Sequence, residues 1–256
     1  MRHCRFSTST GPQYGIVEGD QIVRLMPPPE EDPRVVPCGS FRPLPLASAQ
    51  LLCAVAPSKI VCVGRNYREH AAELGNDVAT EPLLFFKPPS SLIANGDTIV
   101  RPAQSQRVDY EGELGIVIGK TCTKLASDAD VREYIRGYTV VNDVTARDLQ
   151  KKDSQWARAK GFDTFCPVGP IVTDEIDPFT GVDVTTKLNG TVKQHGNTRD
   201  FIFDIPTMIR YIADIFTLVP GDLIATGTPA GVSPMNSGDV VEVTVEGIGT
   251  LRNPVQ

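Results

Sequence analysis

The sequence has 256 residues, of which 41% are hydrophobic and 22% are charged, and its formal net charge is -6. This balance is typical of a globular protein with one large core, or with a large core and a small appended module. An acidic chain without a cluster of Lys or Arg is a poor candidate for binding nucleic acid or an anionic membrane surface.

No apolar run is long enough to span a bilayer, and no signal-peptide core follows Arg2 and Arg5. The cysteines are scattered and form no C-x-x-C pair, which favours free, buried thiols in a reducing compartment over a disulfide framework. We therefore expect a cytoplasmic protein. The six cysteines are Cys4, Cys38, Cys53, Cys62, Cys122 and Cys166.

The first fifty-odd residues predict a small β-rich module, residues 1–56. Residues 14–25 form two apolar runs around Gly19-Asp20, a pattern typical of a β-hairpin. A polar loop rich in Pro and acidic residues follows at 27–33.

A larger domain, residues 57–256, is predicted to begin with a buried strand at 59–64. A short helix should follow and end at Gly75. Apolar runs at 113–119 and 138–143 read as buried strands. Residues 144–161 predict one helix, and residues 205–218 predict another, with Pro206 in its first turn.

The C-terminal residues 240–255 alternate as a β-hairpin does, and the polar stretch around His195 reads as a turn. Strands outnumber the predicted helices and do not alternate with them regularly. This pattern indicates an α+β fold built on a large mixed sheet, and not a doubly wound parallel sheet.

Three carboxylates lie at predicted strand ends. Glu111 and Glu113 are two residues apart, so on a strand they point to the same face, roughly 6.5–7 Å apart. Asp143 ends the next strand. A hard cation such as Mg²⁺, Mn²⁺ or Ca²⁺ would relieve the repulsion among them. Alternatively, the two glutamates face solvent and Asp143 or Thr145 caps the following helix; spacing alone does not separate these interpretations.

Other polar residues could act beside such a cation. His70 and Glu73 share a face of the predicted helix, where a carboxylate would orient the imidazole as a general base. Arg147 and Gln150 share a face of the next helix, and with Lys160 they could hold a carboxylate. Each set could equally be solvated surface.

The glycine-rich turn at 227–228 follows a buried strand, and its backbone N–H groups could hold an anion. Such turns are common, so this signal is weak by itself.

Taken in order, these motifs resemble the fumarylacetoacetate hydrolase family. The resemblance covers about four-fifths of the chain, from Ser58 to the C-terminus. The matching strings are VGRNYREHAAELG, PLLFFKPPSSLIANGDTI, VDYEGELGIVIG, GYTVVNDVTARDLQ, ARAKGFDTFCPVGP and PGDLIATGTPAGVSPMNSGDVVEV. The resemblance implies a mixed β-sandwich roll and a homodimer.

The resemblance also implies roles for individual residues. The metal ligands would be Glu111, Glu113 and Asp143. The water-activating dyad would be His70 and Glu73, as in acylpyruvase-like members, and Lys160 would act with them. The substrate-holding residues would be Arg147, Gln150 and Thr228, with Tyr67 and Lys87 in the same site. Some members add a carboxylate just before the tyrosine; here Arg65-Asn66 stands there, so three protein carboxylates are expected.

The function that follows from this resemblance is metal-dependent hydrolysis of a C–C bond in a small acylpyruvate-type oxo acid, through an enolate and a water activated by His70. The alternatives are an isomerase of the 5-carboxymethyl-2-hydroxymuconate type and an oxaloacetate decarboxylase. A metal- and dicarboxylate-binding module without turnover is a further alternative.

Overall fold

A computed structural model describes residues 1–29, 31, 41–73, 75 and 78–256. Strands predominate in these residues, and the predicted α+β, mixed β-sandwich fold is confirmed. Cys38 and residues 30, 32 and 33 of the predicted polar loop lie outside the described residues. The five cysteines that are described carry free thiols. Among the described residues, no helix has the length and apolar character needed to cross a membrane.

The larger sheet of the described chain has eleven strands in the order β4-β3-β2-β1-β12-β10-β9-β15-β5-β6, with β7 paired to β12. Its strands are β1 (Arg2–Thr8), β2 (Gly11–Glu18), β3 (Gln21–Met26), β4 (Leu44–Pro45), β5 (Ile60–Gly64), β6 (Leu83–Lys87), β7 (Leu92–Ile93), β9 (Gly112–Ile118), β10 (Ile135–Asn142), β12 (Cys166–Thr173) and β15 (Leu223–Ala225). Apolar runs fill β5, β9 and β10, which suits strands covered on both faces.

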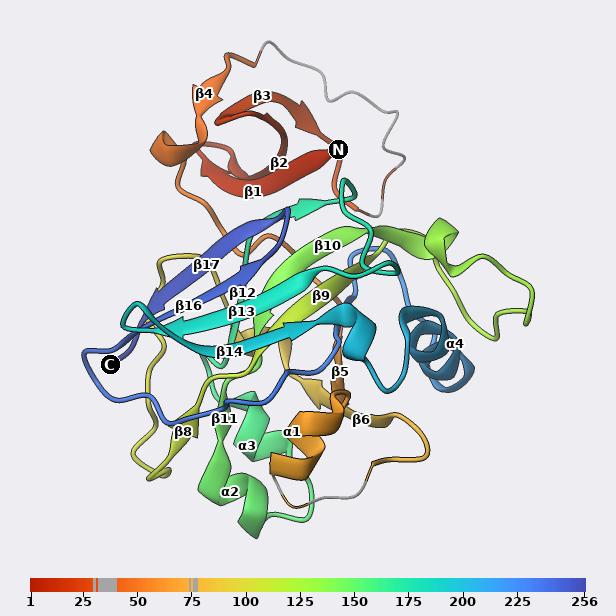
Figure 1. The fold of residues 1–256 in the computed structure, drawn as a ribbon. Helices are drawn as coiled ribbons and strands as arrows, with labels where there is room; N and C mark the ends of the chain where they lie inside the picture. The colour runs from red at the N-terminus through yellow and green to blue at the C-terminus, as the bar shows by residue number, and fades with distance from the viewer. Residues whose placement is uncertain (30, 32–40, 74, 76–77) are drawn as a thin grey trace.

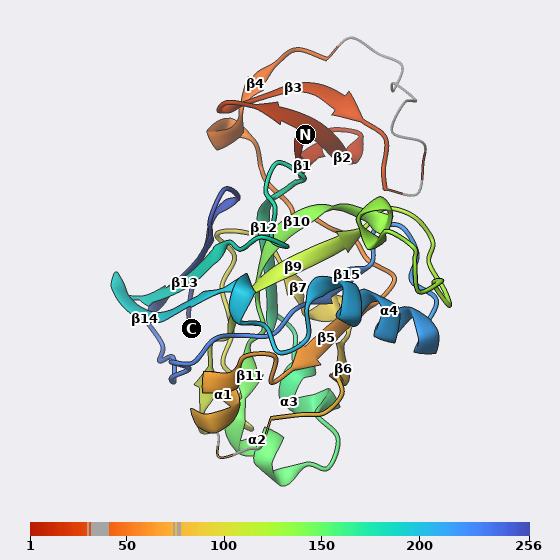
Figure 2. The same ribbon diagram turned by 45° about the vertical axis from the view of Figure 1, so that its right-hand side comes forward.

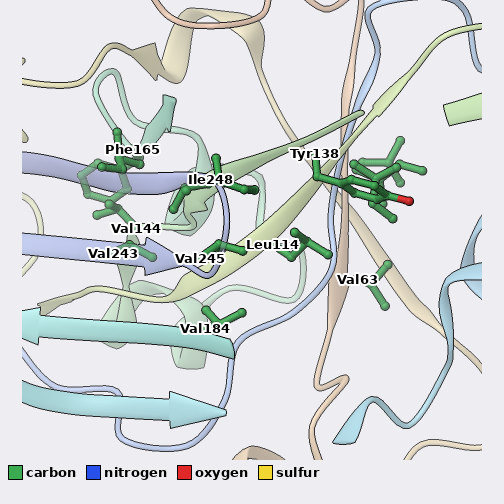
Figure 3. Packing of buried hydrophobic residues seen from close by; sticks show 14 of the residues in the cluster. Val63, Leu114, Tyr138, Val144, Phe165, Val184, Val243, Val245 and Ile248 are labelled. Atoms are coloured by element: carbon green, nitrogen blue, oxygen red, sulfur yellow. The ribbon is translucent and has the colours of Figure 1, made fainter. Parts of the chain in front are cut away.

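A second sheet packs on the first, in the order β14-β13-β16-β17. Its strands are β13 (Asp183–Leu188), β14 (Thr191–Asn197), β16 (Val240–Val245) and β17 (Gly249–Pro254), and a separate pair joins β8 (Val108–Asp109) to β11 (Thr145–Ala146). Figure 3 shows Leu114 of β9 close to Val245 and Val184 of the second sheet. All three side chains are fully buried, so apolar burial holds the two sheets together.

Short helices gather at the end of the sandwich that lies opposite the N-terminal strands (Figures 1 and 2). These are α1 (Arg68–Glu73), α2 (Arg147–Lys152) and α3 (Ala157–Gly161); the longer α4 (Ile205–Ile215) lies beside the sheet. The 3-10 turns are η1 (Leu46–Ser48), η2 (Pro89–Ser91), η3 (Val131–Tyr134) and η4 (Thr198–Asp200).

The helix predicted over 144–161 is wrong, because α2 and α3 are separate. Asp153 closes α2 by donating its N–H to the carbonyl of Leu149, and its backbone is extended. Its carboxylate then binds Arg158 of α3. Asp and Ser compete with helical hydrogen bonds, so Asp153-Ser154 is a local breaking point.

The predicted N-terminal hairpin is confirmed as β2 and β3, and the predicted C-terminal hairpin as β16 and β17. Strand β1 was not predicted from the sequence; it pairs with β12 through Arg2 and His3, so the N-terminal strands continue the large sheet. The placement of His195 in a turn is wrong: it lies in β14, where Nδ1 contacts the Thr185 hydroxyl at 3.1 Å. The boundary at residues 56 and 57 stays a prediction.

Candidate active site

Strand pairing brings three acidic residues together. In the antiparallel β9–β10 pair, Gly112 lies opposite Asn142, so Glu111, Glu113 and Asp143 meet at one end. The Asp143 N–H donates to the Glu111 carbonyl at 2.8 Å. The Glu111 N–H donates to the Asn142 side chain at 3.0 Å.

The carboxylates form a compact buried cluster. One oxygen from each of Glu111, Glu113 and Asp143 lies within 4.8 Å of the others, and none of the three residues is more than 4% exposed. Buried like charges at this spacing are costly unless cations balance them.

Three buried cations balance two of these carboxylates. Lys160 Nζ donates to Glu111 at 2.8 Å and to Asp143 at 2.6 Å. Arg147 donates to Glu111 at 2.5 Å and to Asp109 at 2.9 Å. Lys87 donates to Asp143 at 2.7 Å from behind the cluster. Burial opposes ionisation of Glu111, but Lys160 and Arg147 outweigh it and hold its pKa below the ordinary value.

Glu113 is the carboxylate without a cation partner among the described residues. Its Oε2 accepts the Gly227 N–H at 2.8 Å and forms no ion pair. Burial, with the negative charges of Asp143 and Glu111, raises the pKa of Glu113 well above its ordinary value. Glu113 is therefore the carboxyl group of the cluster that no lysine or arginine in the described chain contacts directly.

A divalent metal fits this cluster. All three donors are carboxylates, which hard cations such as Mg²⁺, Mn²⁺ and Ca²⁺ prefer, and a cation would supply the partner that Glu113 lacks. The buried acidic triad can thus bind a divalent metal, with ligands at the adjoining ends of two paired strands.

A cavity of about 220 Å³ opens onto the triad. Most of the residues named by the sequence analysis line it: the triad itself, His70, Arg147, Gln150, Lys160 and Thr228. Gln150 accepts a hydrogen bond from Arg147 at 2.7 Å, which confirms that the two share a face of α2. The remaining three predicted residues do not line this cavity: Glu73, Tyr67 and Lys87.

His70 and Glu73 lie on the same face of α1, as predicted. His70 is 4% exposed, and its Nδ1 is 3.3 Å from Glu73 Oε2. Glu73 also accepts the Gly231 N–H, at 3.1 and 3.2 Å to its two oxygens. Glu73 therefore contacts the Nδ1 side of the imidazole ring. The other ring nitrogen, His70 Nε2, has no protein partner in the described part of the chain.

Tyr67 and Lys87 lie beside the cavity and not in its wall. Tyr67 lines a neighbouring cavity of about 410 Å³ and packs edge-on against Phe201, with ring centroids 5.1 Å apart. Lys87 is 1% exposed and donates its remaining hydrogen bonds to the carbonyls of Val144 and Lys160. Lys87 therefore fixes the position of the Asp143 carboxylate.

The predicted binding turn uses its backbone as well as its side chain. Gly227 has φ +98°, a conformation that favours glycine, and directs its N–H to Glu113. The Thr228 hydroxyl donates to the Gly112 carbonyl at 2.9 Å. This hydrogen bond uses the only proton of the hydroxyl. Contact between the Thr228 hydroxyl and a substrate carboxylate therefore stays a prediction, and it would require the hydroxyl to give up its hydrogen bond to Gly112.

Six cavity residues were not assigned to the site from the sequence: Val63, Gly64, Arg65, Phe85, Lys151 and Trp156. Arg65 stands in the left-handed region with φ +59°, and its guanidinium lies 5.9 Å from the Trp156 ring. Neither Arg65 nor Lys151 forms an ion pair with a described residue. The only available signal was the position of Arg65 within the motif around His70.

Two models of known protein families match the chain. The model for the fumarylacetoacetate (FAA) hydrolase C-terminal domain matches residues 59–256, and the model for the N-terminal domain of Rv2993c-like proteins matches residues 1–53. The chain belongs to the fumarylacetoacetate hydrolase family. The resemblance inferred from the motifs is confirmed.

Three similar proteins carry functional names. The structure of 5-carboxymethyl-2-hydroxymuconate delta-isomerase from Mycobacterium smegmatis superposes with a TM-score of 0.90 at 41% identity, over 100% of this chain and 99% of that one. Oxaloacetate tautomerase YisK of Bacillus subtilis is 41% identical over 212 residues, 78% of this chain and 70% of its own length. The 2,4-didehydro-3-deoxy-L-rhamnonate hydrolase of a Sphingomonas species is 37% identical over 274 residues, 100% of this chain and 96% of its own length.

Proposed function

We propose that this family member is a metal-dependent isomerase or tautomerase of a small 2-oxo or 2-hydroxydienoic dicarboxylic acid. The observation that carries the proposal is the buried carboxylate triad opening onto a cavity lined by His70. The isomerase and tautomerase relatives support this alternative over the hydrolysis that the sequence analysis placed first.

A divalent cation held by Glu111, Glu113 and Asp143 would act as a Lewis acid toward the 2-oxo and carboxylate oxygens of the substrate. The protein then has to move a proton. A proton on His70 Nδ1, donated to Glu73, leaves the Nε2 lone pair directed to the cavity side. His70 can take a proton from the carbon next to the oxo group and return it to oxygen, giving the enol, or to a conjugated carbon, giving the isomer.

A second carboxylate on the substrate is supported by the charges in the cavity wall. Arg147 and Lys160 are already bound to Asp109, Glu111 and Asp143. Arg65 and Lys151 line the same cavity without such partners among the residues that the structure describes. A dicarboxylate therefore has two cations free to bind its distal end.

Hydrolysis is the second candidate, because the His70–Glu73 contact is the arrangement that water activation needs and a hydrolase relative matches the whole chain. It requires a water between His70 and the carbonyl carbon that is attacked.

Analysis of the reaction products distinguishes isomerisation or tautomerisation from hydrolysis. Purified protein with Mg²⁺ or Mn²⁺ is incubated with oxaloacetate, a 5-carboxymethyl-2-hydroxymuconate and an acylpyruvate, and the products are identified by NMR. The proposal predicts isomer or enol–keto interconversion of the dicarboxylates with intact carbon chains. Cleavage of the acylpyruvate with no effect on either dicarboxylate would replace the proposal with hydrolysis.

A further inference from the structure

Gln194 occupies a buried position behind the carboxylate triad. It belongs to β14, the edge strand of the second sheet, and is 1% exposed, whereas its neighbours Lys193 and His195 are exposed. Its Oε1 accepts the Gly112 N–H at 3.0 Å. Its Nε2 donates to the Thr228 hydroxyl at 2.8 Å and to the Pro229 carbonyl at 2.7 Å.

These contacts form a closed ring around Gly112. The Gly112 N–H binds Gln194, Gln194 binds the Thr228 hydroxyl, and that hydroxyl donates to the Gly112 carbonyl at 2.9 Å. Both amide hydrogens of Gln194 are used. The single side chain thus joins the middle of the Glu111-Gly112-Glu113 segment to the turn after β15.

Glycine at position 112 is required by the close approach of the second sheet. A Cβ there would lie 2.1 Å from Thr186 Oγ1 and 2.9 Å from Val243 Cγ1. Glycine is also the residue whose backbone dihedral angles are least restricted. A change in the dihedral angles of Gly112 would move Glu111 and Glu113 relative to each other, so this segment needs a restraint from outside its own strand.

We infer that Gln194 is a positioning residue for the metal site: by holding both backbone groups of Gly112, directly and through Thr228, it fixes the spacing of Glu111 and Glu113. The inference rests on the metal site of the proposed function. Gln194 also holds the turn whose Gly227 N–H binds Glu113, so it acts on that ligand from two directions. Removing such an outer contact typically weakens metal affinity about 10–100-fold.

The test is Mn²⁺ affinity, measured by isothermal titration calorimetry on the full chain. Gln194→Met keeps the side-chain length and removes all three hydrogen bonds. Asn253→Met is the matched control, because the Asn253 amide is 1% exposed and donates to two backbone carbonyls, of Ala94 and Asp97, away from the cavity. We expect a 10–100-fold rise in the Mn²⁺ dissociation constant for Gln194→Met, and less than a twofold change for the control.

A folded Gln194→Met protein that binds Mn²⁺ within twofold of wild type would overturn the inference and leave Gln194 as a structural residue. Should Gln194→Met fail to fold, Gln194→Glu decides: it keeps an acceptor for Gly112 and loses both donors, and an unchanged dissociation constant overturns the inference. Weakened Mn²⁺ binding in a chain that lacks isomerase activity even as wild type would support Gln194 while rejecting the proposed function. A wild-type chain that does not bind Mn²⁺ would reject both.

Discussion

Glu111 and Glu113 stand two residues apart but have opposite surroundings. Glu111 is bound to Lys160 and Arg147, whereas Glu113 accepts one backbone N–H. In metal-free buffer, we expect Glu113→Gln to raise the melting temperature, because it removes a buried carboxyl group whose ionisation is disfavoured by burial and by Asp143 and Glu111. A gain of about 1–2 kcal/mol corresponds to roughly 2–8 °C for a chain of this size.

Glu111→Gln is the matched comparison and should lower the melting temperature, because it leaves Lys160 and Arg147 with fewer partners, at a cost of about 3–5 kcal/mol. Differential scanning fluorimetry with and without Mn²⁺ provides the measurement. Added Mn²⁺ should raise the melting temperature of the wild type by more than it raises that of either variant. A metal-free Glu113→Gln protein that melts below wild type would contradict the charge assignment.

We expect Arg65 to bind the distal carboxylate of the substrate, because Arg65 lines the cavity and has no ion-pair partner among the described residues. Arg65→Met should lower kcat/KM for a dicarboxylate by about tenfold or more, because a charge-assisted hydrogen bond contributes about 1.5–3 kcal/mol. Arg68→Met is the control, because exposed Arg68 on α1 does not line this cavity. Equal losses on dicarboxylate and monocarboxylate substrates would exclude this role.

At the scale of single elements, β1 joins the N-terminal strands to β12 through a buried histidine. His3 is 1% exposed and pairs with Val172. Burial, with the positive charges of Arg136 and the N-terminal amine, lowers the pKa of His3 to about 3. The unfolded chain therefore binds a proton near pH 6.5 that the folded chain takes up only near pH 3, so stability falls as the pH falls through this window.

Between pH 7 and pH 5, this difference should cost the wild type about 2 kcal/mol. The His3→Gln variant lacks the titrating group, so its free energy of unfolding should fall by about 2 kcal/mol less than that of the wild type over the same pH interval. Urea denaturation at the two pH values measures the difference. Parallel losses in the two proteins would mean that His3 is protonated in the folded state.

The sequence was informative where function follows from local pattern. The E-x-E pair at a strand start and Asp143 at the next strand end left a metal site and solvent-facing glutamates equally open, and the family resemblance selected the triad. The structure brings the three carboxylates together because antiparallel neighbours place such strand ends side by side. Gln194 could not be found this way. It lies 82 positions from Gly112, and the surrounding residues read as a polar turn because an edge strand exposes one face. Arg65 was missed because its left-handed backbone leaves no mark in the sequence.

At the scale of the molecule, the homodimer implied by the family resemblance stays a prediction, and β6 is where we expect it to form. This edge strand exposes Leu83 and Phe86 to 37% and 41%, next to Ile215 at 53%. Unpaired strand edges with apolar side chains favour association. Phe86 also packs edge-on against Phe216, with ring centroids 5.0 Å apart.

Light scattering after size-exclusion chromatography tests this expectation. The wild type should elute as a dimer, and Phe86→Glu should shift it to monomer. Val192→Glu is the control, since Val192 is 53% exposed on β14 of the other sheet. A dimer that survives Phe86→Glu would place the interface elsewhere.

Proton exchange at the carbon next to the oxo group tests the central claim, metal-dependent enolisation without carbon–carbon cleavage, most directly. Oxaloacetate is followed by NMR in D₂O with Mg²⁺, with the rate due to metal alone subtracted, for the wild type and for Glu113→Gln. We expect the wild type to accelerate deuterium incorporation and enol–keto interconversion while pyruvate forms no faster than the background. Glu113→Gln should lose the acceleration. Exchange no faster than with metal alone, or cleavage as fast as exchange, would contradict the central claim.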